Sequence, residues 1–425
     1  MNESFIHYLW QHQYFRREGL DTHRGEAIQV FNPGKLNRNA GPDFLEAKIK
    51  IGPIDWAGSV EIHIKSSDYN SHQHQNNPAY NNVVLHVVWQ HDQEVQREDG
   101  TLIPTLELRT RVDETLIKEY RKLIHSSFQI PCSNSFSRIK PLTVISMIEQ
   151  AAIQRLRTKA TIIQQQYKDN KGDWEETFYQ VLAKNFGFKI NAEPFGALAK
   201  AVPLRVIRKN SDIQKTEALL FGMAGFLDVK KGDNYFLTLQ KEFDFLVHKF
   251  NLTDRKMNKA QWKFLRLRPA NFPTLRMAQL ACVLSNTMPL FEKILNEQEL
   301  PGIKKIFSIQ ASPYWQVHYS FGKESNKGYG NLGEESIDNI LINSVVPMMA
   351  AYAQERNEGM FFERTLEFLQ KIKPESNTIL RSWQSLGVKA TNAFDSQGFI
   401  EQMNEGCKKR NCLNCSVGNY LLKPA

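Results

Sequence analysis

The stretch that decides the fold is residues 39–92, which read NAGPDFLEAKIKIGPIDWAGSVEIHIKSSDYNSHQHQNNPAYNNVVLHVVWQHD. Within it, residues 43–51 and 56–65 alternate apolar and polar side chains, whereas residues 83–89 are almost wholly apolar. Successive side chains of a strand point to opposite faces, so this pattern predicts two strands with one polar face each, followed by a buried central strand. A Gly-Pro pair between the first two strands predicts the turn that joins them.

The flanking segments extend this sheet into a mixed α/β domain. Residues 3–16 have the apolar spacing of an amphipathic helix, and residues 114–125 have the same spacing. Residues 27–31 and 102–109 have the pattern of strands. The polar residues 71–80 predict a loop or a short helix.

From residue 142 onward the apolar spacing changes to the period of helices. We therefore predict an α+β protein with a mixed α/β sheet domain at residues 1–135. A basic, mostly α-helical domain at residues 136–425 follows and carries the C-terminal cysteines. The boundary is expected in the loop of residues 130–141. The predicted helices of the second domain are residues 145–166, 174–185, 216–227, 235–250 and 337–353, with shorter ones at 361–372, 377–386 and 396–406.

The composition is that of a globular protein with more than one core. The chain has 425 residues, of which 41% are hydrophobic and 23% charged. No apolar run reaches the roughly 18 residues that a membrane span requires, and the N-terminus lacks the pattern of a signal peptide. Five cysteines, three of them near the C-terminus, do not form a secreted disulfide framework. These features predict a cytoplasmic protein without a membrane partner.

The net charge of +9 is unevenly distributed. Residues 1–135 hold 14 basic and 17 acidic residues, a net charge of −3, and 9 of the 11 histidines. The remaining residues hold 40 basic and 28 acidic residues, a net charge of +12. A basic domain of this kind predicts an anionic partner such as nucleic acid, with a solvated surface as the alternative.

The candidate catalytic residues lie on the first two strands of the quoted stretch. Asp43 begins one strand, and Glu61, His63 and Lys65 share a face of the next. Two carboxylates on adjacent strands can share Mg²⁺ or Mn²⁺, which would activate water beside a phosphodiester, with His63 or Lys65 positioning or deprotonating that water. Alternation along the strand would place the Asp43 side chain on the same face as the apolar row that begins at Leu45. The predicted metal site therefore requires Asp43 to lie at the very start of the strand. The alternative is structural, with Asp43 in a turn and the others on a solvated face.

A histidine cluster offers a second metal site. His72 and His74, with His63 or His86, could form a transition-metal site of nitrogen and oxygen ligands, to which the nearby Asp68 could contribute. Such a site predicts a zinc- or manganese-dependent hydrolase of a small molecule. Alternatively, His72 and His74 belong to an exposed polar loop. His86 interrupts an apolar strand and needs a polar partner, which the Asp43–Glu61 site could supply.

The basic part contains one arginine-rich turn that could contact phosphates. Residues 266–276 read RLRPANFPTLR, which places Arg266, Arg268 and Arg276 around a Pro-Asn-Phe-Pro turn. Guanidinium groups at a turn or helix start are suited to phosphate contacts. Scattered surface charge is the alternative at each single position.

The C-terminal cysteines have metal-ligand spacing. The segment reads Cys407-x4-Cys412-x2-Cys415, and Cys132 at the predicted domain boundary is a candidate fourth ligand. Three clustered thiols of this kind are typical of part of a zinc knuckle or of an iron–sulfur site. A metal there would fasten the end of the chain to the end of the sheet domain. Free thiols are the alternative, and Cys282, in an apolar run, is expected in the core.

The quoted stretch resembles the PD-(D/E)XK, or restriction-endonuclease-like, nuclease superfamily. The matching residues are Pro42-Asp43 and, 18 positions on, Glu61-Ile62-His63, within the order helix, three strands, helix, strand over residues 3–90. The resemblance implies a metal-dependent nuclease of that fold in which Asp43 and Glu61 bind the metal. Here His63 occupies the family's lysine position, and Lys65 lies two residues further along the same face. An iron–sulfur staple with one early and three late cysteines, known in some members, is also implied.

Two other interpretations of the sequence remain open, one of the function and one of the family. The histidine at the lysine position also fits a non-catalytic nucleic-acid-binding protein on a degenerate nuclease-like scaffold. Over nearly its full length the chain resembles an uncharacterised bacterial family known only as a domain of unknown function, which implies no activity. The residues that carry this resemblance are GPDF at 41–44, VEIH at 60–63, SSDY at 66–69, PAYNNVVLHVV at 78–88, LRPANFP at 267–273 and the C-terminal cysteines.

Overall fold

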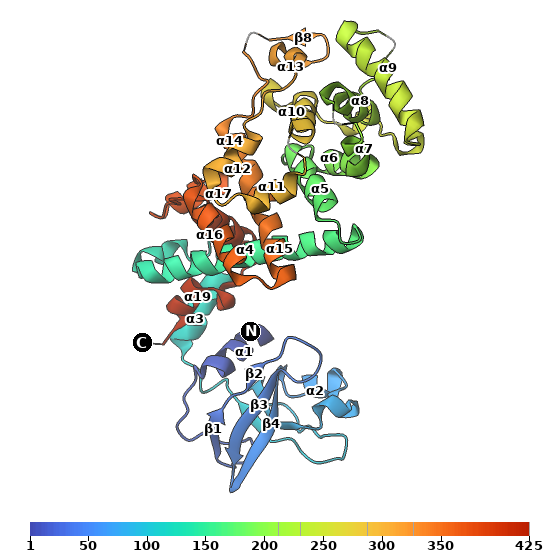
Figure 1. Cartoon of the computed structure of the whole chain (residues 1–425). Coiled ribbons are helices and arrows are strands. Elements are labelled where there is room, and N and C mark those ends of the chain that lie inside the picture. The colour runs from blue at the N-terminus through green and yellow to red at the C-terminus, as the bar shows by residue number, and fades with distance from the viewer. Residues whose placement is uncertain (211, 230, 287, 326, 425) are drawn as a thin grey trace. The chain divides into compact units, whose positions relative to one another are not determined.

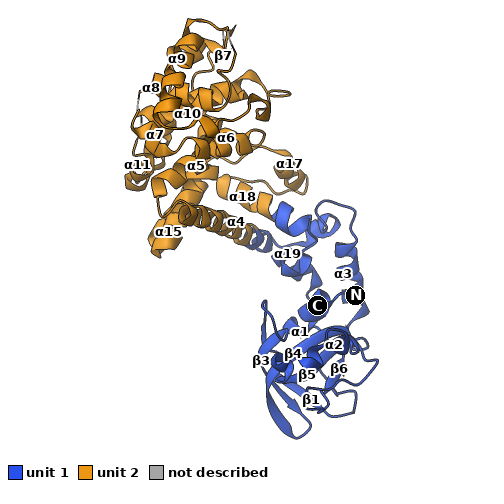
Figure 2. Cartoon of the chain, turned by 90° about the vertical axis from the view of Figure 1, so that its right-hand side faces the viewer, with its two compact units in different colours: residues 1–147, 402–425 blue, residues 148–401 orange. Residues whose placement is uncertain are grey.

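The chain folds into two compact units, coloured separately in Figure 2. The computed structural model describes residues 1–210, 212–229, 231–286, 288–325 and 327–424. Unit 1 consists of Met1–Met147 and Gln402–Ala425, and unit 2 of Ile148–Glu401. The α+β class is confirmed, with a sheet in the N-terminal part and helices in most of the rest. The C-terminal cysteine segment, predicted as part of the helical domain, belongs instead to unit 1.

Unit 1 is built on one mixed sheet in the strand order β1-β3-β4-β5-β6, with the short β2 paired to β3. Strand β3 is antiparallel to both β1 and β4, whereas β5 is parallel to both β4 and β6. The strand predicted at 102–109 is reduced to three residues. The bounds are β1 Ile28–Asn32, β2 Lys35–Leu36, β3 Phe44–Ile51, β4 Ile54–Lys65, β5 Val83–Gln90 and β6 Thr105–Glu107 (Figure 1).

Helix α1 (Glu3–His12) covers one face of this sheet. Asn2 accepts a hydrogen bond from the Phe5 main chain and caps the start of the helix. Gln13, in the left-handed conformation with φ 54°, ends it, so the helix is shorter than the predicted 3–16. The buried residues Phe5, Ile6, Leu9 and Trp10 pack with the apolar row of the strands, which includes Phe44, Ile49, Ile62 and Leu85. This is the core of unit 1.

A β-bulge in β3 changes which face its first residues present. Phe44 pairs with Val60, but the next pair is Ala47 with Gly58, so Leu45 and Glu46 together oppose one residue of β4. Glu46 has a φ of 61°, and Leu45 is 38% exposed while Phe44 is fully buried. The bulge therefore breaks the parity that placed Asp43 in the apolar row of Ala47 and Ile49. This side chain is turned to the face that carries Glu61.

Helices α3 and α19 pack into the same core as α1, whereas the segment after β4 packs separately. Residues 66–82 contain the short helix α2 and two 3-10 turns, which agrees with the predicted loop or short helix. The buried side chains Tyr69, Tyr80, Val83, Val95 and Ile103 form a separate small cluster. The bounds are α2 Asp68–Ser71, the turns His74–Asn76 and Pro78–Tyr80, α3 Glu114–Ile124 and α19 Ser416–Leu422.

Unit 2 is helical, apart from a two-stranded hairpin of β7 (His318–Ser320) and β8 (Lys323–Glu324). Helices α6, α7 and α10 to α13 were not predicted. In α10 every residue from Pro273 to Leu284 is buried, so the helix has no polar stripe from which a period could be recognised. Its helices are α4 Pro141–Asp169, which begins in unit 1, α5 Trp174–Phe186, α6 Ala192–Ala201, α7 Leu204–Arg208, α8 Ile213–Met223, α9 Asn234–Lys249, α10 Pro273–Asn286, α11 Leu290–Asn296, α12 Leu300–Phe307, α13 Pro313–Val317, α14 Glu334–Ile340, α15 Val346–Arg356, α16 Gly359–Lys371, α17 Thr378–Gln384 and α18 Ala393–Glu401.

Among the described residues, no helix combines the length and the apolar composition that a membrane crossing needs.

Candidate metal centre

Asp43 and Glu61 lie side by side at the start of β3 and near the end of β4. The Asp43 main-chain N–H donates to Glu61 Oε2 at 3.1 Å, and the Ile62 N–H donates to Asp43 Oδ2 at 3.0 Å. Helix α1 supplies a third group, because His7 Nε2 lies 3.2 Å from Asp43 Oδ2. The bulge, by turning Asp43 to this face, is what makes these contacts possible.

Four histidines continue the cluster from Glu61. His63, on the same face of β4, directs Nδ1 to His86 Nε2 at 2.9 Å and Nε2 to His72 Nδ1 at 3.1 Å. His74 Nε2 lies 3.3 Å from Glu61 Oε1, and His63 Nε2 lies 3.8 Å from the same oxygen. Ring nitrogens of His63, His72 and His74 all lie within 4.8 Å of one another.

The segment after β4 brings its two histidines back to the strand. Helix α2 ends at Ser71, and Gln73 adopts the left-handed conformation with φ 60°, which reverses the chain between His72 and His74. Tyr80 stacks on His74 with ring centroids 3.9 Å apart. The segment therefore holds His74 against Glu61, whereas His72 is exposed, as expected for a polar loop.

A buried tyrosine packs against three of these imidazoles. Tyr69 is fully buried, and its ring lies 5.3 Å from His74, 5.4 Å from His86 and 6.2 Å from His63, centroid to centroid. Its hydroxyl is buried and has no hydrogen-bond partner among the residues that the structure describes. Tyr69 therefore fills the space behind the histidines and restricts their rings.

Burial dominates the electrostatics of the centre. Burial, with the Asp43 charge second, raises the pKa of Glu61 to about 9. Burial, followed by His74 and His72, lowers the pKa of His63 to about 3, and burial with His63 holds the pKa of His86 well below its ordinary range. Near neutral pH the imidazoles of His63 and His86 are therefore neutral and offer lone pairs. A bound cation would favour ionised Glu61.

The donor set fits a divalent transition metal. His63, His72, His74 and Glu61 supply three imidazole nitrogens and one carboxylate oxygen, with neighbouring donors 3.1, 3.3 and 3.8 Å apart. A tetrahedron with metal–ligand bonds of about 2.0–2.1 Å has an edge of roughly 3.3 Å. Imidazole-rich sites suit zinc or iron better than magnesium, which prefers oxygen ligands. His86, bonded to the second nitrogen of His63, would orient that ligand.

Two residues predicted for the site lie outside these contacts. The Lys65 side chain is exposed, and its main-chain N–H donates to Asp68 Oδ2 at 2.9 Å. Asp68 thereby caps the turn between β4 and α2 and is committed to the main chain. The sequence missed His7, Tyr69 and Tyr80. The only sequence signal for His7 is its place on a predicted amphipathic helix near the quoted stretch.

A second histidine group lies nearer the surface of unit 1. Nitrogens of His23 and His91 and an oxygen of Glu94 lie within 4.8 Å of one another, and the centroids of the two tilted imidazole rings are 3.6 Å apart. Arg24 Nε already pairs with Glu94 Oε1 at 3.2 Å. This group is more exposed than the centre around Glu61.

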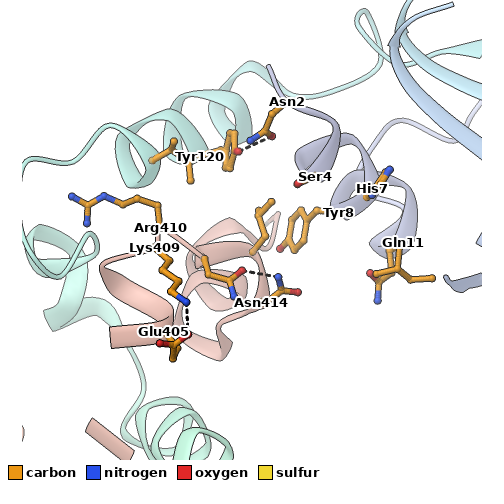
Figure 3. A pocket seen from close by; sticks show the side chains of 14 residues that line it. Asn2, Ser4, His7, Tyr8, Gln11, Tyr120, Glu405, Lys409, Arg410 and Asn414 are labelled. Atoms are coloured by element: carbon orange, nitrogen blue, oxygen red, sulfur yellow. Dashed lines mark hydrogen bonds and ion pairs between the residues drawn. The ribbon is translucent and has the colours of Figure 1, made fainter. Parts of the chain in front are cut away.

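A polar cavity of about 430 Å³ adjoins the centre through His7 (Figure 3). Helix α1 forms one side with residues that include Ser4, His7 and Tyr8. The C-terminal segment forms another side with Lys409, which pairs with Glu405, as well as Arg410, Asn411 and Asn414. His7 thus lines the cavity and contacts Asp43.

The three arginines differ in their availability. Arg266 and Arg268 are exposed. Arg276 is 5% exposed, its guanidinium donates to Gln279, Asn271 and Ser336, and it stacks over the Phe188 ring at 4.3 Å. The predicted phosphate contact of Arg276 is therefore wrong for this structure, since its donors are used inside unit 2.

The four cysteines predicted as a metal site, Cys132, Cys407, Cys412 and Cys415, all belong to unit 1 as free thiols. Cys282 lies in the core of unit 2 and donates to the Gln310 carbonyl oxygen. This agrees with its expected place.

Comparison with curated proteins and with solved structures gives no match for the chain. Residues 3–378 match a family described as a protein of unknown function, DUF2851, and the chain belongs to that family.

Proposed function

We propose that this protein is a metal-dependent hydrolase that cleaves phosphodiester bonds of nucleic acid. One observation carries the proposal. A main-chain hydrogen bond joins Asp43 to Glu61 across β3 and β4, the two carboxylates contact His7 and His74, and the buried imidazoles of His63 and His86 lie beside them. Strongly perturbed titratable groups that converge on one point are typical of catalytic centres.

The residues of the centre divide into three roles. Three of the donors of His63, His72, His74 and Glu61 would hold the metal and leave one position open for water, and His86 would keep His63 in the tautomer with a free Nε2. The metal would polarise a phosphoryl oxygen and lower the pKa of its bound water. Asp43 with His7 lies beside the ligands and next to the cavity, where this pair would orient the water and accept its proton.

The donor chemistry sharpens the choice of metal. A site of Asp43 and Glu61 alone would suit Mg²⁺ or Mn²⁺, but three imidazoles beside Glu61 favour Zn²⁺ or another transition metal. His63, in the position where the PD-(D/E)XK resemblance expects lysine, would then be a metal ligand. Catalysis would therefore need no side-chain ammonium at this position.

Two observations support nucleic acid as the substrate. Residues 136–425 carry a net charge of +12, and Arg266 and Arg268 in that part are exposed. In unit 1, α1 is followed by four strands, of which β2 has only two residues, and then by α2 and the parallel strand β5. Apart from β2, this order agrees with the one expected from the nuclease resemblance. Hydrolysis of a small phosphodiester is the second candidate, favoured by the imidazole-rich donor set.

The test is cleavage by the full chain loaded with Zn²⁺, Mn²⁺ or Mg²⁺. Substrates are plasmid, linear duplex, single-stranded DNA, RNA and bis(p-nitrophenyl) phosphate. Asp43→Asn and Glu61→Gln should each lower the cleavage rate by about 100-fold or more. The matched control is Asp55→Asn, which changes an exposed carboxylate on β4 outside the centre.

Three results would redirect or refute the proposal. Cleavage that survives both variants means that the centre is not the active site. Hydrolysis of the small ester alone favours the second candidate. Salt-sensitive binding of nucleic acid by the metal-loaded protein without any cleavage favours the non-catalytic binding protein.

A further inference from the structure

Four thiols from distant parts of the sequence converge in unit 1. Cys132 precedes the 3-10 helix Ser133–Arg138, and Cys407, Cys412 and Cys415 lie between α18 and α19. Cys412 is buried in the core of the sheet domain, and Cys132 packs against that core. The C-terminal segment therefore returns to the region of the chain that carries Cys132.

Hydrogen bonds hold the segment in this place. Arg410 Nη2 donates to the Ser126 carbonyl oxygen at 2.7 Å, a few residues before Cys132. The Gln402 side-chain amide lies 3.4 Å from Cys415 Sγ and 3.8 Å from Cys407 Sγ, so one donor serves two of the sulfurs. Donors directed at sulfur are a common feature of thiolate-bound clusters.

All four thiols act on one another electrostatically. Burial, with Cys415 and Cys412 next, raises the pKa of Cys132 to about 12. Burial, with Cys415 next, raises that of Cys412 to about 11. Burial and the other three thiols raise the pKa of Cys407, so every pair of the four is near enough to interact. Cys407 and Cys412 are buried, and Cys132 and Cys415 are half-buried.

The separation of the sulfurs indicates the size of the ligand. Among the described residues, no three of these thiols lie within 4.8 Å of one another, unlike the three histidines. A single zinc ion with bonds of about 2.3 Å would draw four sulfurs to about 3.8 Å apart. In an iron–sulfur cluster the four thiolates bind two or four different irons, so their sulfurs lie further apart than the sulfurs around a single zinc ion. The C-x4-C-x2-C spacing with one distant cysteine is also a known cluster pattern.

We propose that Cys132, Cys407, Cys412 and Cys415 bind an iron–sulfur cluster that fastens the C-terminal segment to the sheet domain. The cluster holds residues 405–414, which form one side of the cavity beside His7. Its role is structural, and the proposal is independent of the reaction at the metal centre. The three late ligands lie beyond residue 378, where the family match ends.

The test is the composition of the full chain expressed and purified without oxygen. Iron, acid-labile sulfide and zinc are measured per chain, together with visible absorption. The wild type should contain about two or about four irons with equal sulfide, which also identifies the cluster type. Wild type with about one zinc and no sulfide, or with no metal, overturns the proposal without reference to any variant.

Serine variants then assign the ligands. Each of Cys132→Ser, Cys407→Ser, Cys412→Ser and Cys415→Ser should lose at least half of the iron. Cys282→Ser, the matched control from unit 2, should keep all of it. Circular dichroism identifies variants that fail to fold. These variants are set aside, and the ligands are assigned from the iron content of the folded variants. Iron that is unchanged in folded variants of all four cysteines overturns the assignment.

Discussion

Asp43 donates its main-chain N–H to the carboxylate of Glu61 at 3.1 Å, which ties the start of β3 to the end of β4. The Asp43 side chain lies on the face of Glu61 because Leu45 and Glu46 form a bulge that turns it away from the apolar row. Bulges are frequent beside active sites, where they redirect a side chain. The geometry of the centre thus depends on a main-chain irregularity two residues away, and this can be tested.

Gly34 supports that bulge. It has a φ of 92°, and a Cβ on it would lie 2.7 Å from the Leu45 carbonyl oxygen. Gly34→Ala should lower the free energy of unfolding of unit 1 by about 1–3 kcal/mol, because both the conformation and the contact become unfavourable. Zinc affinity should fall with it, since Asp43 and Glu61 are displaced. Denaturant unfolding and metal titration measure the two effects.

The control for Gly34 is Gly25→Ala, which has a φ of 82° but meets no atom within 4 Å. It should cost only the conformational part and leave zinc affinity unchanged. Equal effects of the two substitutions on metal affinity would contradict the link between the bulge and the centre.

His86 is expected to act on the metal through His63. Its Nε2 lies 2.9 Å from His63 Nδ1, and the residue is completely buried. His86→Leu removes the partner that fixes the tautomer of His63, so zinc affinity should fall by about 10–100-fold. Competition with a chromophoric chelator measures the affinity, and His125→Leu, at an exposed position, is the control. Unchanged affinity in folded His86→Leu would exclude this role.

Glu217 predicts a pH dependence of stability in unit 2. Its carboxylate accepts hydrogen bonds from Tyr235 at 2.6 Å and from Ser312 at 2.8 Å, yet burial raises its pKa from 4.5 to about 7. The folded state therefore binds the proton more tightly than the unfolded state. The stabilisation is full below pH 4.5, is lost as the pH rises to about 7, and changes no further above it. The loss is about 3 kcal/mol.

Glu217→Gln should remove this slope, because a neutral amide cannot titrate. Unfolding of unit 2 is measured by denaturant at pH 5, 6, 7 and 8 for wild type and variant. The difference between the two cancels all other titrating groups. Glu367→Gln, at an exposed position, should keep the wild-type slope. A slope that is equal in wild type and Glu217→Gln would refute the assignment.

The sequence revealed the strands well and the long-range contacts poorly. Alternation located β3, β4 and β5 because it is a local property, and it placed Glu61 and His63 on one face. The bulge was invisible, since it depends on the pairing of β3 with β4. For the same reason the contact of His7 with Asp43 could not be predicted, whereas the cysteine spacing did point to a link between the end of the chain and the sheet domain, to which residues 402–425 belong.

The arginine-rich turn provides the last prediction. Arg266 and Arg268 are exposed, whereas Arg276 is buried and donates hydrogen bonds within unit 2. If the turn contacts a nucleic-acid backbone, Arg266→Ala and Arg268→Ala should each weaken binding uniformly across sequences and reduce the salt slope by about 1, without loss of stability. Arg276→Ala should instead lower the unfolding free energy by about 3 kcal/mol, since buried acceptors lose their donor. Salt titrations and denaturant unfolding of the three variants separate the two roles. An unchanged salt slope in Arg266→Ala and Arg268→Ala would remove this turn from the binding surface.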